Sequence, residues 1–417
     1  MKQRIIIVGA GFAGIQLARN LNKDHFDILL IDKLNHHQFQ PLFYQVATSQ
    51  IEPSSISFPV RYIFHEQKNI DIRLAEVESI ELDSKMVYTS IGSFPYDLLI
   101  LAQGCSTNFF GNDQIAKHSF PLKTTYEAIA IRNHILQIFE DVLSADEQER
   151  EYLMNLVIVG AGPTGVELSG AFSEIKQFNL PKDYPKIDFS RFKIYLIEGS
   201  KHTLNNMSEN AKKVSETYLH EMGVTVKKET FVNGYDGRIL TLSTGEKIKT
   251  KTVIWAAGVT ANVIQGLPET SRAAGNRIKV DRFNRVIGVE SVYAIGDIAF
   301  METPNYPKAH PQVANVAINQ AKNLAKNLER IINQKPLKEF EYRDLGSMAT
   351  VGRHKAVVDF PKLKISGYFA WFIWMFLHLM LILSVKNKLI IFIQWSWAYI
   401  SKNSSLRLIL TPQNSKN

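Results

Sequence analysis

The chain has a single cysteine, Cys105, among its 417 residues, and this scarcity excludes several kinds of chemistry. One cysteine cannot form a disulfide within the chain, and it cannot form the Cys-x-x-Cys pair of a thiol redox enzyme. We expect Cys105 to be a packed small residue in a protein of a reducing compartment. No metal site is predicted from the sequence.

A secretory leader is also missing from the first residues, MKQRIIIVGAG. Such a leader needs about 7–15 consecutive apolar residues and a cleavage site of small residues, whereas the apolar run here is short and ends at glycines. We therefore expect the chain to begin with a β-strand and to stay on the cytoplasmic side of the membrane.

Acidic residues are absent after Asp359, although seven Lys and Arg residues occur there, so this tail carries seven of the eight net positive charges. The rest of the chain is nearly neutral, which removes the support for a nucleic-acid-binding protein. Hydrophobic residues make up 45% of the chain, enough for two or three domains with substantial cores.

What is present is the same glycine pattern twice, IVGAGFAGIQLA from Ile7 and IVGAGPTGVELSG from Ile158. In each, an apolar run precedes Gly-x-Gly-x-x-Gly and a helical pattern follows it. The first glycine permits a tight turn, the second lets the backbone approach a pyrophosphate, and the third lets helix and strand pack closely. A Gly-rich turn without a ligand is the alternative for one copy, but two copies favour two dinucleotide sites.

Each copy is followed by an acid at the end of the next expected strand, where it can bind the ribose hydroxyls. Asp32 lies 23 residues after Gly9, and Glu198 lies 38 residues after Gly160. The expected spacing is about 20 residues, so we predict an insertion before Glu198, in KQFNLPKDYPKIDFSRF. The simplest pair of ligands is a tightly held FAD at the first copy and NADH at the second, because Glu198 would repel the 2′-phosphate of NADPH.

The order of the patterns predicts an α/β fold of two intertwined Rossmann-like dinucleotide-binding domains and a C-terminal amphipathic helical segment that anchors the protein to a membrane. We place the first part of the FAD domain in 1–118, the NADH domain in 119–262, the second part of the FAD domain in 263–345 and the membrane-associating region in 346–417. A long helix is expected over about 311–332.

The sequence resembles the type II NADH:quinone oxidoreductases of the two-dinucleotide-binding flavoproteins. The segments that carry this resemblance are GAGFAG, FQPLFYQVAT, LILAQGCSTNFFG, VGAGPTGVELSG, VIWAAGV, YAIGD and GSMATVGRHKAVVD. The resemblance implies a single-chain enzyme that oxidises NADH, reduces FAD and passes two electrons to a membrane quinone without pumping protons.

The resemblance also implies roles for individual residues. Glu167 is expected near the contact of flavin and nicotinamide, where a carboxyl group with a raised pKa relays protons; an acid that complements the helix dipole is the alternative. The predicted FAD contacts are Gly9, Gly11, Gly14, Asp32, Gln45, Thr48 and Asp297, and the predicted NADH contacts are Gly160, Gly162, Gly165, Glu198 and Gly258. A helix N-cap for Asp297, a packing loop for Gln45 and Thr48, and a plain turn for Gly258 remain open.

On the quinone side, relatives have two glutamines where this chain has Asn315 and Asn319. The spacing of four residues puts both amides on one helix face, although Asn is one methylene shorter than Gln. Gln320 is expected to point elsewhere on the helix. His354 and Lys355 are expected near the mouth of the quinone site, with a solvated turn as the alternative.

The tail contains the apolar run ISGYFAWFIWMFLHLMLILSV, residues 365–385, and then LIIFIQWSWAYI. The first is about as long as a transmembrane helix, but its Trp residues and the following Lys386 and Lys388 suit a helix that lies in the membrane interface. A buried dimer face is the other interpretation. Two further functions stay open: a flavin reductase that serves a protein carrier, and a membrane-docked redox sensor without quinone turnover.

Overall fold

The computed structural model describes residues 2–401 and 406–410 and divides the chain into two compact units. Unit 1 consists of residues 1–38, 58–106 and 259–343, and unit 2 of residues 39–57, 107–258 and 344–417. Each unit is assembled from three segments of the chain. Residues 39–57 belong to unit 2, although they lie within the segment that we predicted as the first part of the FAD domain.

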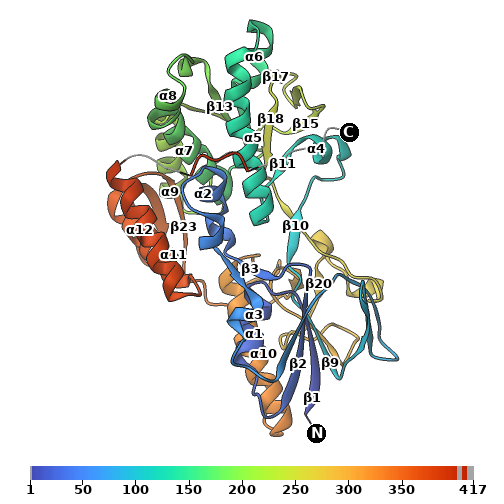
Figure 1. Cartoon of the computed structure of the whole chain (residues 1–417). Coiled ribbons are helices and arrows are strands. Elements are labelled where there is room, and N and C mark those ends of the chain that lie inside the picture. Colours follow the sequence, from blue (N-terminus) through green and yellow to red (C-terminus); the bar gives the residue numbers. More distant parts are fainter. Residues whose placement is uncertain (1, 402–405, 411–417) are drawn as a thin grey trace. The chain divides into compact units, whose positions relative to one another are not determined.

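Unit 1 is built on a five-stranded parallel sheet in the order β21-β9-β1-β2-β5 (Figure 1). Its strands are β1 (Gln3–Val8), β2 (Phe26–Asp32), β5 (Ile70–Leu74), β9 (Leu98–Leu101) and β21 (Val292–Ala294). The segments YDLLILAQG and SVYAIGDIA both contribute strands to this sheet: β9 lies beside β1, and β21 lies beside β9.

Alternate residues of these strands enter two separate cores, because successive side chains of a strand point to opposite faces. Ile5 and Ile7 pack with α1 (Phe12–Asn20) and α10 (Ala314–Ile332). Ile6 and Val8 pack with the antiparallel strands β6 (Val77–Glu81), β7 (Met86–Thr89) and β8 (Gly92–Pro95). Unit 1 also contains α3 (Val60–Ile63), β20 (Ile278–Lys279) and β22 (Ala299–Phe300).

Unit 2 repeats the same sheet plan in the order β11-β18-β12-β13-β14, with all neighbours parallel. The strands are β11 (Phe120–Pro121), β12 (Asn155–Val159), β13 (Lys193–Ile197), β14 (Val224–Lys227) and β18 (Thr252–Trp255). An antiparallel sheet of β15 (Val232–Tyr235), β16 (Ile239–Leu242) and β17 (Lys247–Lys249) follows β14. The helices before β18 are α2 (Phe43–Ala47), α4 (Asp113–His118), α5 (Thr125–Ser144), α6 (Glu147–Leu153), α7 (Pro163–Phe178), α8 (Leu180–Asp183) and α9 (Glu209–Glu221).

The insertion predicted before Glu198 is present. Helix α7 has 16 residues where α1 has 9, and α8 and a short 3₁₀ turn (Phe189–Arg191) precede β13. The longer helix matters for function, because its extra turns lie along the cavity described below.

The C-terminal part of unit 2 consists of the antiparallel strands β23 (Ser347–Gly352), β24 (Lys355–Asp359) and β25 (Lys364–Ser366), followed by α11 (Tyr368–Leu381) and α12 (Val385–Ser401). The apolar run 365–385 is therefore not one helix, since it begins in β25 and its helical part ends at Leu381. Among the helices of the described residues, none combines the length and the apolar character that crossing a bilayer requires.

Candidate functional site

The glycine turn of unit 1 leaves no room for side chains at two of its three glycines. Gly9 has φ +106°, and a Cβ there would lie 2.4 Å from the carbonyl oxygen of Ala102. A Cβ at Gly14 would lie 1.8 Å from the carbonyl oxygen of Gly9. Gly11 is the N-cap of α1 and has open space where its Cβ would be. The backbone is therefore exposed at the helix N-terminus, the position that suits a phosphate.

The glycine turn of unit 2 has the same geometry. Gly160 has φ +100°, and a Cβ there would lie 2.6 Å from the carbonyl oxygen of Ala256. A Cβ at Gly165 would lie 1.8 Å from the carbonyl oxygen of Gly160, and Gly162 is the open N-cap of α7. The two turns are thus equivalent cradles for a dinucleotide pyrophosphate.

The two strand-end acids also occupy equivalent positions. Asp32 accepts hydrogen bonds from the backbone N–H of Ala10 at 2.5 Å and of Leu34 at 2.7 Å. Glu198 accepts from Ala161 at 2.6 Å and from Ser200 at 2.7 Å. Each carboxylate is therefore fixed beside its own glycine turn, as the motif requires for a ribose contact. Burial raises the pKa of Asp32, and the bond from Ala10 partly offsets this effect.

Asp297 lies in a short 3₁₀ turn (Gly296–Ile298) directly after β21 in unit 1. Its carboxylate accepts the Sγ–H of Cys105 at 3.0 Å, so the cysteine that we expected only to pack also holds a predicted cofactor residue. Gln320 of α10 accepts the backbone N–H of Gly296 at 2.7 Å, and Gln312 donates to the carbonyl of Asp297 at 3.0 Å. These three hydrogen bonds around Asp297 were not predicted from the sequence.

The predicted nicotinamide-side turn is strained. Gly258 follows β18 with φ +155°, a Cβ there would lie 3.1 Å from the ring of Phe110, and its carbonyl accepts the N–H of Asn108 at 3.0 Å. A side chain at Gly258 would therefore crowd an aromatic residue and adopt an unfavourable backbone conformation.

Gln45 and Thr48 are both buried in and just after α2 of unit 2. The Thr48 hydroxyl donates to the carbonyl of Tyr44 at 2.7 Å, and the Gln45 amide bonds to Tyr44 and Trp395. These hydrogen bonds hold the side chains of Gln45 and Thr48 in place within unit 2.

Glu167 is buried on α7, with 8% of its surface exposed. Burial raises the pKa of Glu167 to about 8, although the backbone N–H of Thr350 and the indole of Trp374 act in the opposite direction. The Trp374 Nε1 makes no hydrogen bond of normal geometry in the described part of the chain, so its effect is that of a nearby dipole. At neutral pH the carboxyl group therefore holds its proton and can give it to a substrate.

Glu167 lines an open cavity with about 80 Å³ of internal space. One face of α7 runs along the cavity and supplies Glu167, Ala171, Glu174, Ile175 and Phe178. The other walls come from α2, β23, α11 and α12, and they are largely aromatic: Tyr44, Trp371, Trp374, Trp395 and Tyr399. The aromatic walls beside Glu167 suit contact with a flat ring.

Several further polar residues in this cavity were missed from the sequence, among them Glu174, Arg353 and Tyr44. Glu174 accepts a short hydrogen bond from the backbone N–H of Arg353, and burial raises its pKa. The Arg353 guanidinium donates to the carbonyl of Ala398, in the last turn of α12, at 2.9 Å. Glu174 could have been predicted, because it follows Glu167 by seven residues and so lies on the same helix face.

The predicted quinone-side residues fall in both units. Asn315 and Asn319 are half-buried on α10 of unit 1, where the Asn319 amide donates to the carbonyl of Asn315 at 2.8 Å. His354 and Lys355 belong to unit 2 and do not line the cavity of Glu167. The His354 ring stacks on Tyr368 at 5.0 Å, and the Lys355 ammonium forms an ion pair with Glu221 at 2.6 Å.

Comparison with known proteins agrees with this geometry. A family described as pyridine nucleotide-disulphide oxidoreductase matches residues 3–321, and a family described as NDH2 C-terminal domain matches residues 345–402. A type II NADH:quinone oxidoreductase of Mycobacterium tuberculosis is 33% identical, with 96% of this chain and 88% of the relative covered. The chain belongs to the type II NADH:quinone oxidoreductase family.

Other members of the family support this assignment. The type II NADH:quinone oxidoreductase of Staphylococcus aureus is 27% identical, covering 85% of this chain and 89% of its own. The fold matches that of NDH2 from Plasmodium falciparum in complex with NADH, with a TM-score of 0.91, 22% identity, and 99% and 100% of the two chains covered. The resemblance inferred from the sequence motifs is thereby confirmed.

Proposed function

We propose that this protein oxidises NADH and reduces a membrane quinone to the quinol, with FAD as the cofactor. The observation that carries the proposal is the continuity of α7, whose first turn is a dinucleotide cradle and whose next turns line the aromatic cavity with Glu167. The net reaction is NADH + H⁺ + quinone → NAD⁺ + quinol, so one proton must come from the protein or the solvent.

Unit 1 is suited to hold the FAD. Gly9 and Gly14 keep side chains out of the cradle, Gly11 opens the N-terminus of α1, and Asp32 is placed for the ribose. Asp297, at the end of β21, is the residue we assign to the ribityl and phosphate region. FAD, when bound, accepts the hydride of NADH and passes two electrons on to the acceptor.

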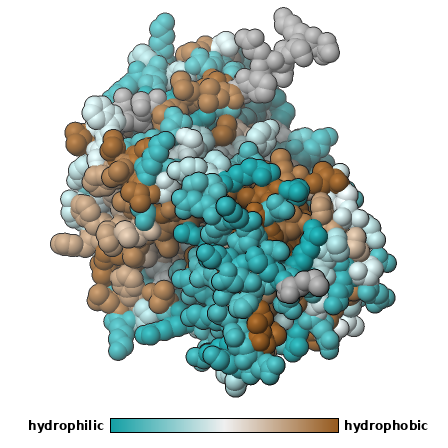
Figure 2. Space-filling model, turned by 60° about the horizontal axis from the view of Figure 1, so that its bottom comes forward, coloured by the Kyte–Doolittle hydropathy of each residue, from teal (hydrophilic) through white to brown (hydrophobic). Residues whose placement is uncertain are grey.

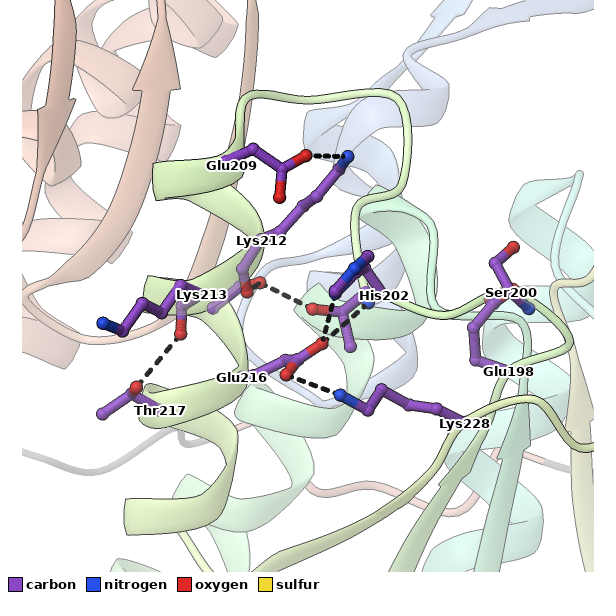
Figure 3. A network of polar contacts seen from close by, with 11 residues as sticks. Glu198, Ser200, His202, Glu209, Lys212, Lys213, Glu216, Thr217 and Lys228 are labelled. Carbon is purple, nitrogen blue, oxygen red and sulfur yellow. Dashed lines mark hydrogen bonds and ion pairs between the residues drawn. The ribbon is translucent and has the colours of Figure 1, made fainter.

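Unit 2 is suited to bind NADH, through Gly160, Gly162, Gly165 and Glu198, with Gly258 on the nicotinamide side. One cation of unit 2 to consider is Lys228, because a free Lys could attract the 2′-phosphate of NADPH. Its ammonium is paired with Glu216 at 2.9 Å, and Glu216 also faces His202 at 3.5 Å (Figure 3). Glu198 stands apart from these ion pairs in Figure 3, so its charge is available to disfavour NADPH.

The quinone headgroup is assigned to the cavity, where Glu167 gives it a proton. A carboxyl group with a pKa of about 8 is protonated at pH 7 and is still acidic enough to lose its proton to a reduced quinone oxygen. Separately from this cavity of unit 2, the resemblance in sequence assigns Asn315, Asn319, His354 and Lys355 to the quinone side, and the Asn pair offers amide donors and acceptors from one face of α10.

Helices α11 and α12 form the surface that we assign to the membrane, on its cytoplasmic face. Large apolar side chains are exposed along both, among them Phe369, Phe376, Ile393, Trp397 and Ile400. In Figure 2, hydrophobic side chains gather at the left, the side on which Figure 1 draws these helices. Lys386 and Lys388 lie at the start of α12, and each cation near an anionic leaflet contributes about 1 kcal/mol.

The proposal is tested with the detergent-solubilised protein and its bound yellow cofactor. Loss of NADH absorbance is followed with and without a short-chain quinone, and flotation with anionic vesicles tests the membrane surface. Rapid quinone-dependent oxidation supports the proposal. Bleaching of the cofactor by NADH without reoxidation by benzo- or naphthoquinones would overturn it and point to another acceptor. Size measurement in detergent decides whether a second copy covers α11 and α12 instead.

A further inference from the structure

A chain of hydrogen bonds joins the proposed membrane helix α12 to the cavity. The Trp395 Nε1–H donates to Gln45 Oε1 at 2.7 Å, and the Gln45 Nε2–H donates to the Tyr44 hydroxyl at 2.9 Å. All three residues are buried, with at most 8% of each exposed. Because the three side chains are largely removed from solvent, each of these hydrogen bonds is costly to lose.

The direction of this chain is fixed by its first member. An indole N–H can only donate, so Gln45 must present its oxygen to Trp395 and its NH₂ group to Tyr44. The Tyr44 oxygen is thereby an acceptor, and its own hydrogen must point away from Gln45. A donor-only residue at one end thus sets the orientation of a hydroxyl group at the other end.

The Tyr44 hydroxyl remains a donor under all ordinary conditions. Burial raises the pKa of Tyr44 well above its usual value, and the charge of Glu167 adds to this effect. Within the described residues no hydrogen bond from the Tyr44 O–H to an acceptor is formed. Tyr44 and Glu167 both line the cavity, and the ring of Trp374, centred 6.3 Å from that of Tyr44, covers the same wall.

We propose that Trp395 is a positioning residue that acts through Gln45 to direct the Tyr44 O–H toward the Glu167 carboxylate. The inference rests on the proposed role of Glu167 as the proton donor to quinone. In that step the O–H bond of Glu167 breaks and its proton moves to the reduced quinone oxygen. Tyr44 keeps its proton and stabilises the carboxylate that is left. The helix proposed to meet the membrane would in this way control how readily Glu167 gives up its proton.

Other charged or titratable groups face the same cavity and must be separated from Glu167 in any titration. They are Glu174 on α7, Arg353 after β23 and Tyr399 on α12. Of these, only Glu174 has a carboxyl group. It accepts a hydrogen bond from the backbone N–H of Arg353, and it is not part of the hydrogen bonds that link Trp395, Gln45 and Tyr44. In an infrared titration, the variant Glu174→Gln therefore shows which carboxyl band belongs to Glu174 and not to Glu167.

The test is an infrared titration of the detergent-solubilised protein with its cofactor, which follows the carbonyl band of protonated carboxyl groups. Glu167→Gln assigns the band of Glu167. Tyr44→Phe should raise the midpoint of that band by about one pH unit, because the ionised form loses a donor. Trp395→Phe should shift it in the same direction by less, since Gln45 can then turn. The double variant should match Tyr44→Phe alone.

Two variants keep this test interpretable. Trp397→Phe makes the same change at an exposed position of α12 and should leave the midpoint unchanged. Gln45→Met breaks the link without altering α12 and should reproduce the shift of Trp395→Phe, even if that variant folds poorly. No shift in Trp395→Phe and Gln45→Met, or additive shifts in the double variant, would overturn the inference. An unchanged rate of quinone reduction in Glu167→Gln would instead overturn the proposed role of Glu167.

Discussion

The two glycine motifs have the same backbone and different surroundings. In both, the first and third glycines leave no room for a Cβ, the second glycine is an open N-cap, and a strand-end acid accepts two backbone N–H groups. They differ two residues after the third glycine, where α1 has Gln16 and α7 has Glu167. The same glycine turn is therefore followed by a neutral amide in unit 1 and by a buried carboxyl group in unit 2.

The length of the helices adds to this difference. Helix α1 ends after 9 residues, whereas α7 continues for 16 and brings a second carboxyl group, Glu174, to the cavity. Two carboxyl groups that line the cavity thus follow the glycine turn of unit 2 on α7, whereas α1 contains no acidic residue. Variants at equivalent residues of the two copies therefore distinguish the role of the glycine turn from the role of the residues around it.

The largest effect is expected from Gly14→Ala and Gly165→Ala. Each new Cβ would lie 1.8 Å from a backbone carbonyl oxygen, so the helix must move, at a cost of about 3 kcal/mol. Gly14→Ala should lose the yellow cofactor and most of its soluble yield. Gly165→Ala should keep the cofactor and lose NADH oxidation. Cofactor absorbance, thermal unfolding and NADH oxidation distinguish the two.

Gly11→Ala and Gly162→Ala are the matched controls for that pair, because nothing lies within 4 Å of their Cβ positions. They should unfold at nearly the wild-type temperature and only weaken binding of the dinucleotide. An equal loss of stability in all four variants would contradict this prediction. It would show that these positions need glycine for the backbone turn, whether or not a Cβ would clash there.

The next largest effect is expected at the position where the two motifs differ, which is Gln16 in α1 and Glu167 in α7. Glu167→Gln should lower kcat for quinone reduction by about 100-fold, the usual contribution of a positioned proton donor. Gln16→Glu, the reciprocal change in unit 1, should leave kcat within a factor of about two, since no proton transfer is assigned there. Steady-state kinetics with a short-chain quinone measures both. A large loss in Gln16→Glu together with a normal Glu167→Gln would reverse the roles of the two helices.

Glu167 in unit 2 should also make the free energy of unfolding depend on pH. Burial raises the pKa of Glu167 to about 8 from its ordinary value of 4.5, so between these values the folded state binds more protons than the unfolded state. The free energy of unfolding should therefore fall as pH rises through this range, by up to about 1.4 kcal/mol per pH unit. Denaturant unfolding of the wild type and Glu167→Gln at pH 5.5 and 7 isolates this effect, and equal slopes would contradict it.

Most of the fold was predictable because its signals are local. The apolar strands, the glycine turns and the acids at the strand ends follow one another in sequence, so β1, α1 and β2, or β12, α7 and β13, could be placed without a structure. The helix over 311–332 was predicted within three residues of α10. The splitting of the run 365–385 at Gly367, which has φ +80°, was hidden by the uniform hydropathy around it.

The site was predictable only in part, because its contacts join distant segments. Tyr44 and Trp395 are 351 residues apart in the sequence and meet through Gln45. Cys105 and Asp297 are similarly remote, and no periodicity relates them. Glu174 was the exception, since the seven-residue spacing from Glu167 was visible. Pairs of buried polar groups are specified by the tertiary fold, and a single sequence contains no local trace of them.

The smallest expected effect is on the choice of pyridine nucleotide, and it again uses equivalent positions. Glu198→Gln removes the negative charge beside the unit 2 cradle, so the ratio of kcat/KM for NADPH to that for NADH should rise about fivefold. Asp32→Asn makes the matching change in unit 1 and should weaken retention of FAD while leaving this ratio unchanged. Adding Glu216→Gln to Glu198→Gln frees Lys228 from its ion pair and should raise the ratio further. If Asp32→Asn changed the ratio as much as Glu198→Gln, the assignment of FAD to unit 1 and NADH to unit 2 would be wrong, because each acid reports on the nucleotide that its own cradle holds.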